Sequence, residues 1–113
     1  MSGYSDGVRV ERAAINEHLK PNGYKTVRGA SSKGFADIVA VKPGQALFIS
    51  FKKTTPPGPA ERANLIRVAD CLPGVGVPLV ALGPASRVTF RRLTGTGPQD
   101  WTPWTPDEIG ESA

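Results

Sequence analysis

Two apolar runs joined by Pro43-Gly44, within the segment ADIVAVKPGQALFISFKK (residues 36–53), constrain the fold of this chain most strongly. Proline followed by glycine is typical of a tight turn between strands. Residues 35–42 and 45–53 are therefore predicted to pair as an antiparallel hairpin.

The remaining elements follow from local patterns on either side of the hairpin. Apolar residues at helical spacing predict helices, and short apolar runs bounded by turn residues predict strands. The predicted elements are a helix at residues 8–20, strands at 24–28, 35–42 and 45–53, a helix at 60–72, and strands within 77–83 and 86–93. This α-β-β-β-α-β-β order predicts an α/β fold with a mixed central β-sheet flanked by α-helices.

The second predicted helix carries the only cysteine of the chain. Its buried face is predicted to consist of Leu65, Val68, Ala69 and Leu72. Cys71 lies in the same apolar pattern and is predicted to be a buried structural thiol. A single cysteine excludes an internal disulfide and favours a reducing, intracellular setting, so we expect a cytoplasmic protein.

The charge of the chain divides at about residue 94. Residues 1–94 carry 14 basic and 6 acidic side chains, a net charge of +8, whereas residues 95–113 carry four acids and no base. We predict one folded domain over residues 1–94 and a mostly irregular, Pro- and Thr-rich acidic tail over 95–113. Thr105-Pro106-Asp107-Glu108 could begin a short terminal helix, and Trp101 and Trp104 are expected to pin the tail to the domain.

The basic domain favours a polyanionic partner, most often nucleic acid, although ordinary surface charge for solubility is the alternative. No apolar run approaches the roughly 20 residues of a membrane span, so no membrane association is expected. The N-terminal segment MSGYSDGVRVER lacks the pattern of a secretory signal. The chain has one histidine and one cysteine, which argues against a zinc site.

Asp37 is the most unusual residue of the predicted hairpin, because a carboxylate within an apolar strand costs free energy unless it is paired or binds a metal. Ser50 and Lys52 share one side of the next strand. A tight turn can bring Asp37 close to both, although the sequence leaves the register open. Glu11 projects from the first helix and could approach the same end of the sheet.

Two acids, a hydroxyl and a lysine in a basic protein are groups that metal-assisted phosphodiester cleavage requires. Mg²⁺ takes hard oxygen ligands and only one or two carboxylates from protein. The metal polarises a phosphoryl oxygen, and a lysine beside it stabilises developing negative charge. The alternative is that Asp37 is a strand-end residue paired with a lysine and that Glu11 is solvated helix surface.

The segment GVRVERAAINEHLKPNGYKTVRGASSKGFADIVAVKPGQALFISFKKT resembles the archaeal-type Holliday junction resolvases, members of the PD-(D/E)XK nuclease superfamily. The likeness extends over residues 7–93. The family pattern is a helical Glu-Arg, a strand that ends in arginine, a serine-containing loop, a strand acid and a (D/E)-x-K element. The matching residues here are Glu11-Arg12, Arg28, Ser31-Ser32-Lys33, Asp37 and Ser50-Phe51-Lys52.

The resemblance implies a structure-selective endonuclease that depends on Mg²⁺, with Mn²⁺ as a substitute, and that cuts four-way DNA junctions as a homodimer. It implies that Glu11, Asp37, Ser50 and Lys52 are catalytic, and that Glu11, Asp37, Ser50 and the Phe51 carbonyl hold the metal. The residues expected to bind DNA are Arg12, Arg28, Ser31, Ser32, Lys33 and Lys53. A prokaryotic or phage origin would suit such a compact enzyme.

Ser50 departs from the family pattern, which has glutamate at this position. In the first alternative, the serine hydroxyl coordinates the metal directly or through water. In the second, the acid comes from Glu61 in the first turn of the second helix, as it does in some relatives of the superfamily. In the third alternative cleavage is lost, and the protein is a DNA-binding recombination accessory. A nuclease of the same superfamily that acts on flaps or forks is also possible.

Overall fold

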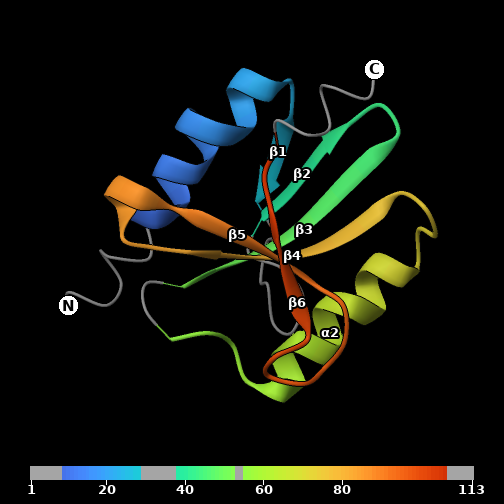
Figure 1. Ribbon diagram of the computed structural model, residues 1–113. Helices are drawn as coiled ribbons and strands as arrows, with labels where there is room; N and C mark the ends of the chain where they lie inside the picture. The colour runs from blue at the N-terminus through green and yellow to red at the C-terminus, as the bar shows by residue number, and fades with distance from the viewer. Residues whose placement is uncertain (1–8, 29–37, 53–54, 107–113) are drawn as a thin grey trace.

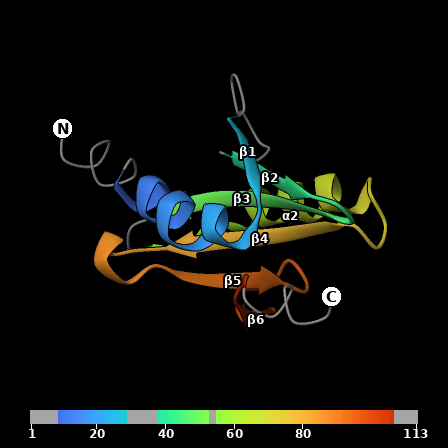
Figure 2. The same cartoon turned by 90° about the horizontal axis from the view of Figure 1, so that it is seen from above.

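The computed structural model describes residues 9–28, 38–52 and 55–106, and its centre is a six-stranded mixed sheet in the order β1-β2-β3-β4-β5-β6. The strands are β1 (Lys25–Arg28), β2 (Ile38–Lys42), β3 (Gln45–Lys52), β4 (Gly76–Leu82), β5 (Thr89–Leu93) and β6 (Trp101–Trp104). Strands β3 and β4 are parallel, and all other neighbours are antiparallel. Figure 2 shows β1 and β6 at opposite edges of the sheet. The predicted α/β class and mixed sheet are confirmed.

One helical segment covers each face of the sheet (Figure 1). The first is α-helical at residues 9–14 and continues as η1, a π-helix (Ile15–Leu19), and η2, a 3₁₀-helix (Lys20–Asn22). It ends at Gly23, whose φ of 88° is a left-handed conformation that glycine adopts without steric cost. The second is α2 (Pro59–Asp70). A further 3₁₀-helix, η3 (Ala85–Arg87), precedes β5.

The predicted hairpin is confirmed, and its register is now defined. Lys42 lies opposite Gln45 with Pro43-Gly44 between them, and Ile38 lies opposite Ile49. Gly44 has a φ of 84°, which the tight turn requires. These two pairs define the register along the whole described hairpin. They therefore also define which face of the sheet each β3 side chain points to.

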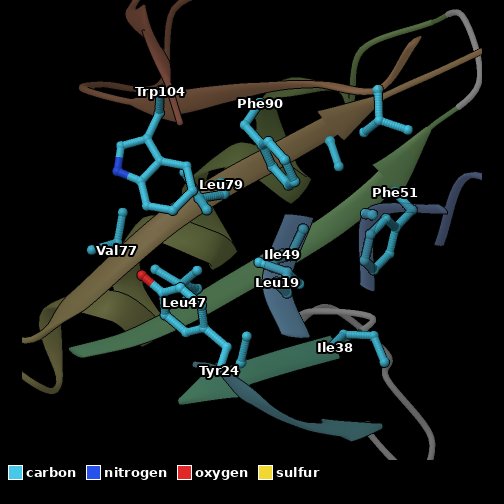
Figure 3. Close-up of a cluster of buried hydrophobic side chains, with 14 of the residues drawn as sticks. Leu19, Tyr24, Ile38, Leu47, Ile49, Phe51, Val77, Leu79, Phe90 and Trp104 are labelled. Atoms are coloured by element: carbon cyan, nitrogen blue, oxygen red, sulfur yellow. The ribbon is translucent and has the colours of Figure 1, made fainter. Parts of the chain in front are cut away.

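The faces of β3 alternate between two hydrophobic clusters. Leu47, Ile49 and Phe51 join the larger cluster, which the first helical segment covers with Val10, Ala14 and Leu19. Figure 3 shows this cluster, including Phe90 and Trp104 from β5 and β6. Phe48 packs instead against the smaller cluster, which contains Leu65 of α2 with Val80, Leu82 and Leu93. Residues 48, 50 and 52 therefore face α2.

Helix α2 packs closely on β4, as the crossover between parallel strands requires. A Cβ atom added to Gly76 would lie 2.9 Å from Ala69 Cα, so only glycine allows this approach of strand and helix. Leu65 is fully buried and Ala69 is 2% exposed, as predicted. Among the described residues, no helix is long and apolar enough to cross a membrane.

Two predictions at the end of α2 are wrong. The helix ends at Asp70, so Cys71 and Leu72 lie in the following turn. The Cys71 thiol is exposed and Leu72 is 42% exposed. Pro73 explains the difference, because proline disfavours helical conformation in the residue before it. Cys71 is therefore not a buried structural thiol.

The segment after residue 94 contains a strand that the sequence did not predict. Strand β6 pairs antiparallel with β5, with Trp104 opposite Phe90 and Trp101 opposite Leu93. Trp104 is 6% exposed, and Trp101 packs against the smaller cluster. The expectation that both tryptophans pin this segment to the domain is confirmed. The proposed terminal helix from Thr105 lies mostly outside the described residues.

Candidate active site

The C-terminal end of β3 carries the two predicted site residues that face α2. Ser50 is 1% exposed, which is unusual for a polar side chain. Lys52 is about one-third exposed at the side chain. Strand alternation explains why both point to the same side, since they are two residues apart. The Ser-x-Lys element therefore presents a buried hydroxyl and a partly exposed ammonium group towards α2.

Glu61 meets both of these side chains from the first turn of α2. The Ser50 hydroxyl donates a hydrogen bond to Glu61 Oε2. Lys52 Nζ lies 3.1 Å from Glu61 Oε1, and the two side chains are 33% and 31% exposed. One carboxylate thus joins the hydroxyl and the ammonium of the Ser-x-Lys element, with a different oxygen for each. We call this group of three residues the Ser-Lys-Glu cluster.

The local sequence of α2 explains how Glu61 reaches β3. Pro59 begins the helix in its first turn, and Glu61 follows where an acid is stabilised by the helix dipole. Leu65, one turn later on the same side, is fully buried in the smaller cluster. Arg62 fixes the start of the helix, because its Nη1 donates to the Pro57 carbonyl at 2.6 Å and its Nε to the Thr96 carbonyl at 2.8 Å.

Glu11 lies on the helical segment that covers the other face of the sheet. It lies on the first helical segment between the buried Val10 and the exposed Arg12, and it is only 9% exposed. Phe51, on the β3 face that packs towards this segment, is 8% exposed. Apart from the Tyr24 phenol, Glu11 and Ser50 are the only buried polar side chains in the described part of the chain. Both are residues that the sequence selected for the site.

Several predicted site residues lie outside the described part of the chain. These are Asp37 and the proposed DNA-binding residues Ser31, Ser32, Lys33 and Lys53. Arg28 ends β1, but its side chain is likewise outside the description. Arg12 is described and exposed. Within residues 9–28, 38–52 and 55–106, no three His, Cys, Asp or Glu side chains are grouped so as to hold a metal ion.

Sequence reasoning treated Glu61 only as an alternative source of the missing acid. The signal for it was an acid in the first turn of the helix after a strand that ends in lysine, which is also where the helix dipole alone favours acids. Arg62 had no recognisable signal, because its acceptors are backbone carbonyls on two different loops. The contacts of α2 with β3 are therefore the main addition that the structure makes to the site.

The mixed sheet with a helix on each face, and the lysine two residues after Ser50 at the end of a central strand, agree with the resemblance found in the sequence. The model of the archaeal Holliday junction resolvase (Hjc) family matches residues 2–57. The crystal structure of Archaeoglobus fulgidus Hjc, described as a Holliday junction resolvase from an archaeal hyperthermophile, is similar over 74% of this chain and 70% of that one. The two share 29% sequence identity, with a TM-score of 0.57.

No curated protein sequence matches the chain. The family match and the similar structure agree with each other and with the order of elements in the sheet. The chain is thus similar to the archaeal Holliday junction resolvases, in sequence over residues 2–57 and in fold over most of its length.

Proposed function

We propose that the protein is a metal-dependent, structure-selective DNA endonuclease that resolves four-way junctions by phosphodiester hydrolysis. The observation that carries this proposal is the family match at residues 2–57, because that segment contains every catalytic residue predicted from the sequence. These residues are Glu11, Asp37, Ser50 and Lys52. The structure of the Archaeoglobus protein, itself described as a Holliday junction resolvase, supports the same activity.

The oxygen groups at the end of β3 suit a divalent metal ion. Glu11, Asp37, Ser50 and the Phe51 carbonyl would hold it, and all four supply the hard oxygen atoms that Mg²⁺ prefers. Glu11 and Ser50 are both buried, and a surrounding of low dielectric constant strengthens the attraction between their oxygen atoms and a cation. We propose Mg²⁺ as the natural ion, with Mn²⁺ as a substitute. The bound ion would polarise the phosphate and activate the attacking water.

Asp37 is included because it matches the strand acid of the family pattern, and it lies outside the described residues. The hairpin that follows it pairs Ile38 with Ile49 and Val39 with Phe48. We propose that Asp37 acts together with Ser50 and Lys52, as the sequence predicts.

Lys52 is suited to bind the scissile phosphate. Its ammonium group has three donors, and one contact to Glu61 Oε1 leaves the others available. A partly exposed cation at this position can orient the phosphate and stabilise the charge that develops on it. We propose that Arg12, Arg28, Ser31, Ser32, Lys33 and Lys53 bind the flanking phosphates, which position DNA without reading its sequence.

We propose that the active form is a homodimer. A four-way junction has two-fold symmetry, and a symmetric dimer would present one site to each of two opposed strands. We also propose that the enzyme acts inside a prokaryotic cell or a cell infected by phage, where junctions arise during DNA recombination and repair. Residues 1–94 would carry the nuclease site, and the C-terminal extension, residues 95–113, adds strand β6 to its sheet.

The test compares labelled four-way junction, fork and linear duplex, each with Mg²⁺, with Mn²⁺ and with chelator. We expect paired symmetric cuts in the junction only, and only with metal. Asp37→Asn should lower cleavage by more than about 100-fold, beyond the usual cost of losing an outer-shell partner, and leave junction binding unchanged. Asp70→Asn is the matched control, because Asp70 is an exposed acid at the far end of α2.

The same assay distinguishes the second candidate function, a DNA-binding recombination accessory without cleavage. The serine at position 50, where the family has an acid, favours this candidate. Junction binding without cleavage by either metal would establish it and refute the endonuclease. Cleavage of forks with the junction left intact would instead show that the protein is a nuclease of the same superfamily with another substrate.

A further inference from the structure

The Ser-Lys-Glu cluster places a carboxylate where the catalytic element of this chain lacks one. The family pattern has an acid two residues before the lysine, and this chain has Ser50. The hydroxyl of Ser50 donates to Glu61 Oε2, so the carboxylate lies within hydrogen-bonding distance of the side chain that would otherwise be acidic. The same carboxylate contacts Lys52, the other functional residue of the element.

The ion pair of Lys52 and Glu61 has little value as a stabilising interaction. Both side chains are about one-third exposed, and water screens ion pairs that are this exposed, so that they contribute little to stability. By contrast, a carboxylate accepts at about four lone-pair positions. The two contacts of Glu61 leave positions available for a metal ion. The arrangement therefore suits a ligand better than a structural clamp.

Ser50 is the donor in its hydrogen bond with Glu61, and this direction affects what the Ser50 oxygen can still bind. Serine has one proton to donate and two lone pairs that accept. With the proton given to Glu61, the lone pairs of the Ser50 oxygen remain available to the metal or to a water bound to it. The bond holds Glu61 in place without removing Ser50 from the donor set. Burial of Ser50 to 1% exposure keeps bulk water from competing for this bond.

We propose that Glu61 supplies the acidic metal ligand that position 50 lacks, and that Ser50 positions the Glu61 carboxylate through its hydrogen bond. This inference rests on the proposed function, because it concerns the metal of the same site. Glu61 would then join the oxygen ligands proposed above, in the role that the strand acid has in the family pattern. The acid would then come from α2 and not from β3.

The first part of the test is metal binding without DNA. The affinity for Mn²⁺ is measured from the electron paramagnetic resonance signal of the free ion, with correct folding checked by circular dichroism. Glu61→Gln keeps the shape of the side chain and an oxygen acceptor for Ser50 but removes the charge. We expect Mn²⁺ affinity to fall at least about tenfold, the lower limit for losing even an outer-shell partner. Glu17→Gln, at an exposed position of the first helical segment, should leave the affinity unchanged.

The second part is an exchange of the two side chains, Ser50→Glu with Glu61→Ser. The exchange keeps the composition of the site and returns the acid to the strand. If Glu61 is a ligand, the exchange should recover most of the Mn²⁺ affinity and cleavage that Glu61→Gln loses. If Glu61 only supported the fold, an acid at position 50 would not restore Mn²⁺ affinity or cleavage. If the exchange variant does not fold, Glu61→Gln decides the question.

The outcomes separate this inference from the proposed function. If Glu61→Gln binds Mn²⁺ and cuts junctions like the wild type while Asp37→Asn does not cut, Glu61 is not a ligand and the endonuclease stands. A folded exchange variant that fails to recover Mn²⁺ affinity also overturns the inference. If no variant cuts any DNA but Glu61→Gln lowers Mn²⁺ affinity, the inference stands and the endonuclease fails. A wild type that does not bind Mn²⁺ refutes both.

Discussion

Trp104→Ala tests whether β6 is an integral part of the folded domain. Trp104 is 6% exposed and belongs to the larger hydrophobic cluster. Its ring meets the Phe90 ring edge-on, with the centroids 5.7 Å apart and an angle of 78° between the planes. This geometry is a favourable aromatic pair, worth about 0.5–1.5 kcal/mol beyond area burial. Substitution by alanine removes both the pair and the buried surface.

The expected loss of stability can be worked from the buried surface. A tryptophan buries about 150–250 Å², which at about 25 cal/mol per Å² corresponds to about 4–6 kcal/mol. The compactness of the unfolded chain lowers such figures by about 10–40%. We therefore expect a loss of about 3–5 kcal/mol in the free energy of unfolding, as is usual for core Trp→Ala changes. That is a large part of the about 5–15 kcal/mol that holds a domain together.

The assay is urea unfolding followed by far-ultraviolet circular dichroism, because the substitution itself changes tryptophan fluorescence. Thr102→Ala is the control, since Thr102 lies on the same strand but is exposed; we expect a change within about 0.5 kcal/mol. Truncation after residue 94 should cost at least as much as Trp104→Ala, because it also removes Trp101. A loss below about 1 kcal/mol for either change would show that residues 95–113 are a separable tail and would refute this reasoning.

Two further predictions concern the close packing of α2 and the burial of Tyr24. Gly76→Ala should lower the free energy of unfolding by about 1–3 kcal/mol, because the new Cβ would lie 2.9 Å from Ala69 Cα. Gly58→Ser is the control and should cost less than about 0.5 kcal/mol, because no atom lies within 4 Å of the new Cβ. Equal losses of stability in the two variants would contradict the close approach of α2 and β4. Burial raises the pKa of Tyr24 from 10.0 to about 12. Between these values the unfolded chain releases the phenol proton while the folded protein keeps it, so stability should fall as the pH rises, by on the order of 2 kcal/mol. Tyr24→Phe should remove this fall in urea titrations across that range, and an unchanged pH dependence would show that the phenol is not responsible.

The parts of the fold that were predictable are those that local chemistry determines. Pro43-Gly44 can form little other than a tight turn, so the hairpin followed from two residues and the apolar runs beside them. The end of α2 is also encoded locally, in Pro73, although the apolar spacing up to Leu72 predicts a longer helix. Exposed Cys71 and Leu72 show that in this chain the proline decides.

Strand β6 could not be predicted, because nothing local requires it. Its four residues, WTPW, include an exposed proline and show no apolar alternation. Proline is tolerated there because β6 is an edge strand, where one row of backbone groups has no partner strand. The strand forms because β5 offers it hydrogen bonds and because Trp104 fills a place beside Phe90. Both causes are contacts with a segment already folded, and a sequence pattern does not contain them.

The candidate site also has a part that the sequence predicts and a part that depends on tertiary contacts. The register of the hairpin connects these two parts. The choice of Ser50 and Lys52 followed from strand alternation, but the contact with Glu61 depends on where the start of α2 lies over β3. That contact exists only because positions 50 and 52 face α2. A slip of one residue at the Pro43-Gly44 turn would turn both side chains towards the first helical segment. It would bring Phe51 to face Glu61 instead, so the turn that defines the sheet also determines which helix can supply an acid to the site.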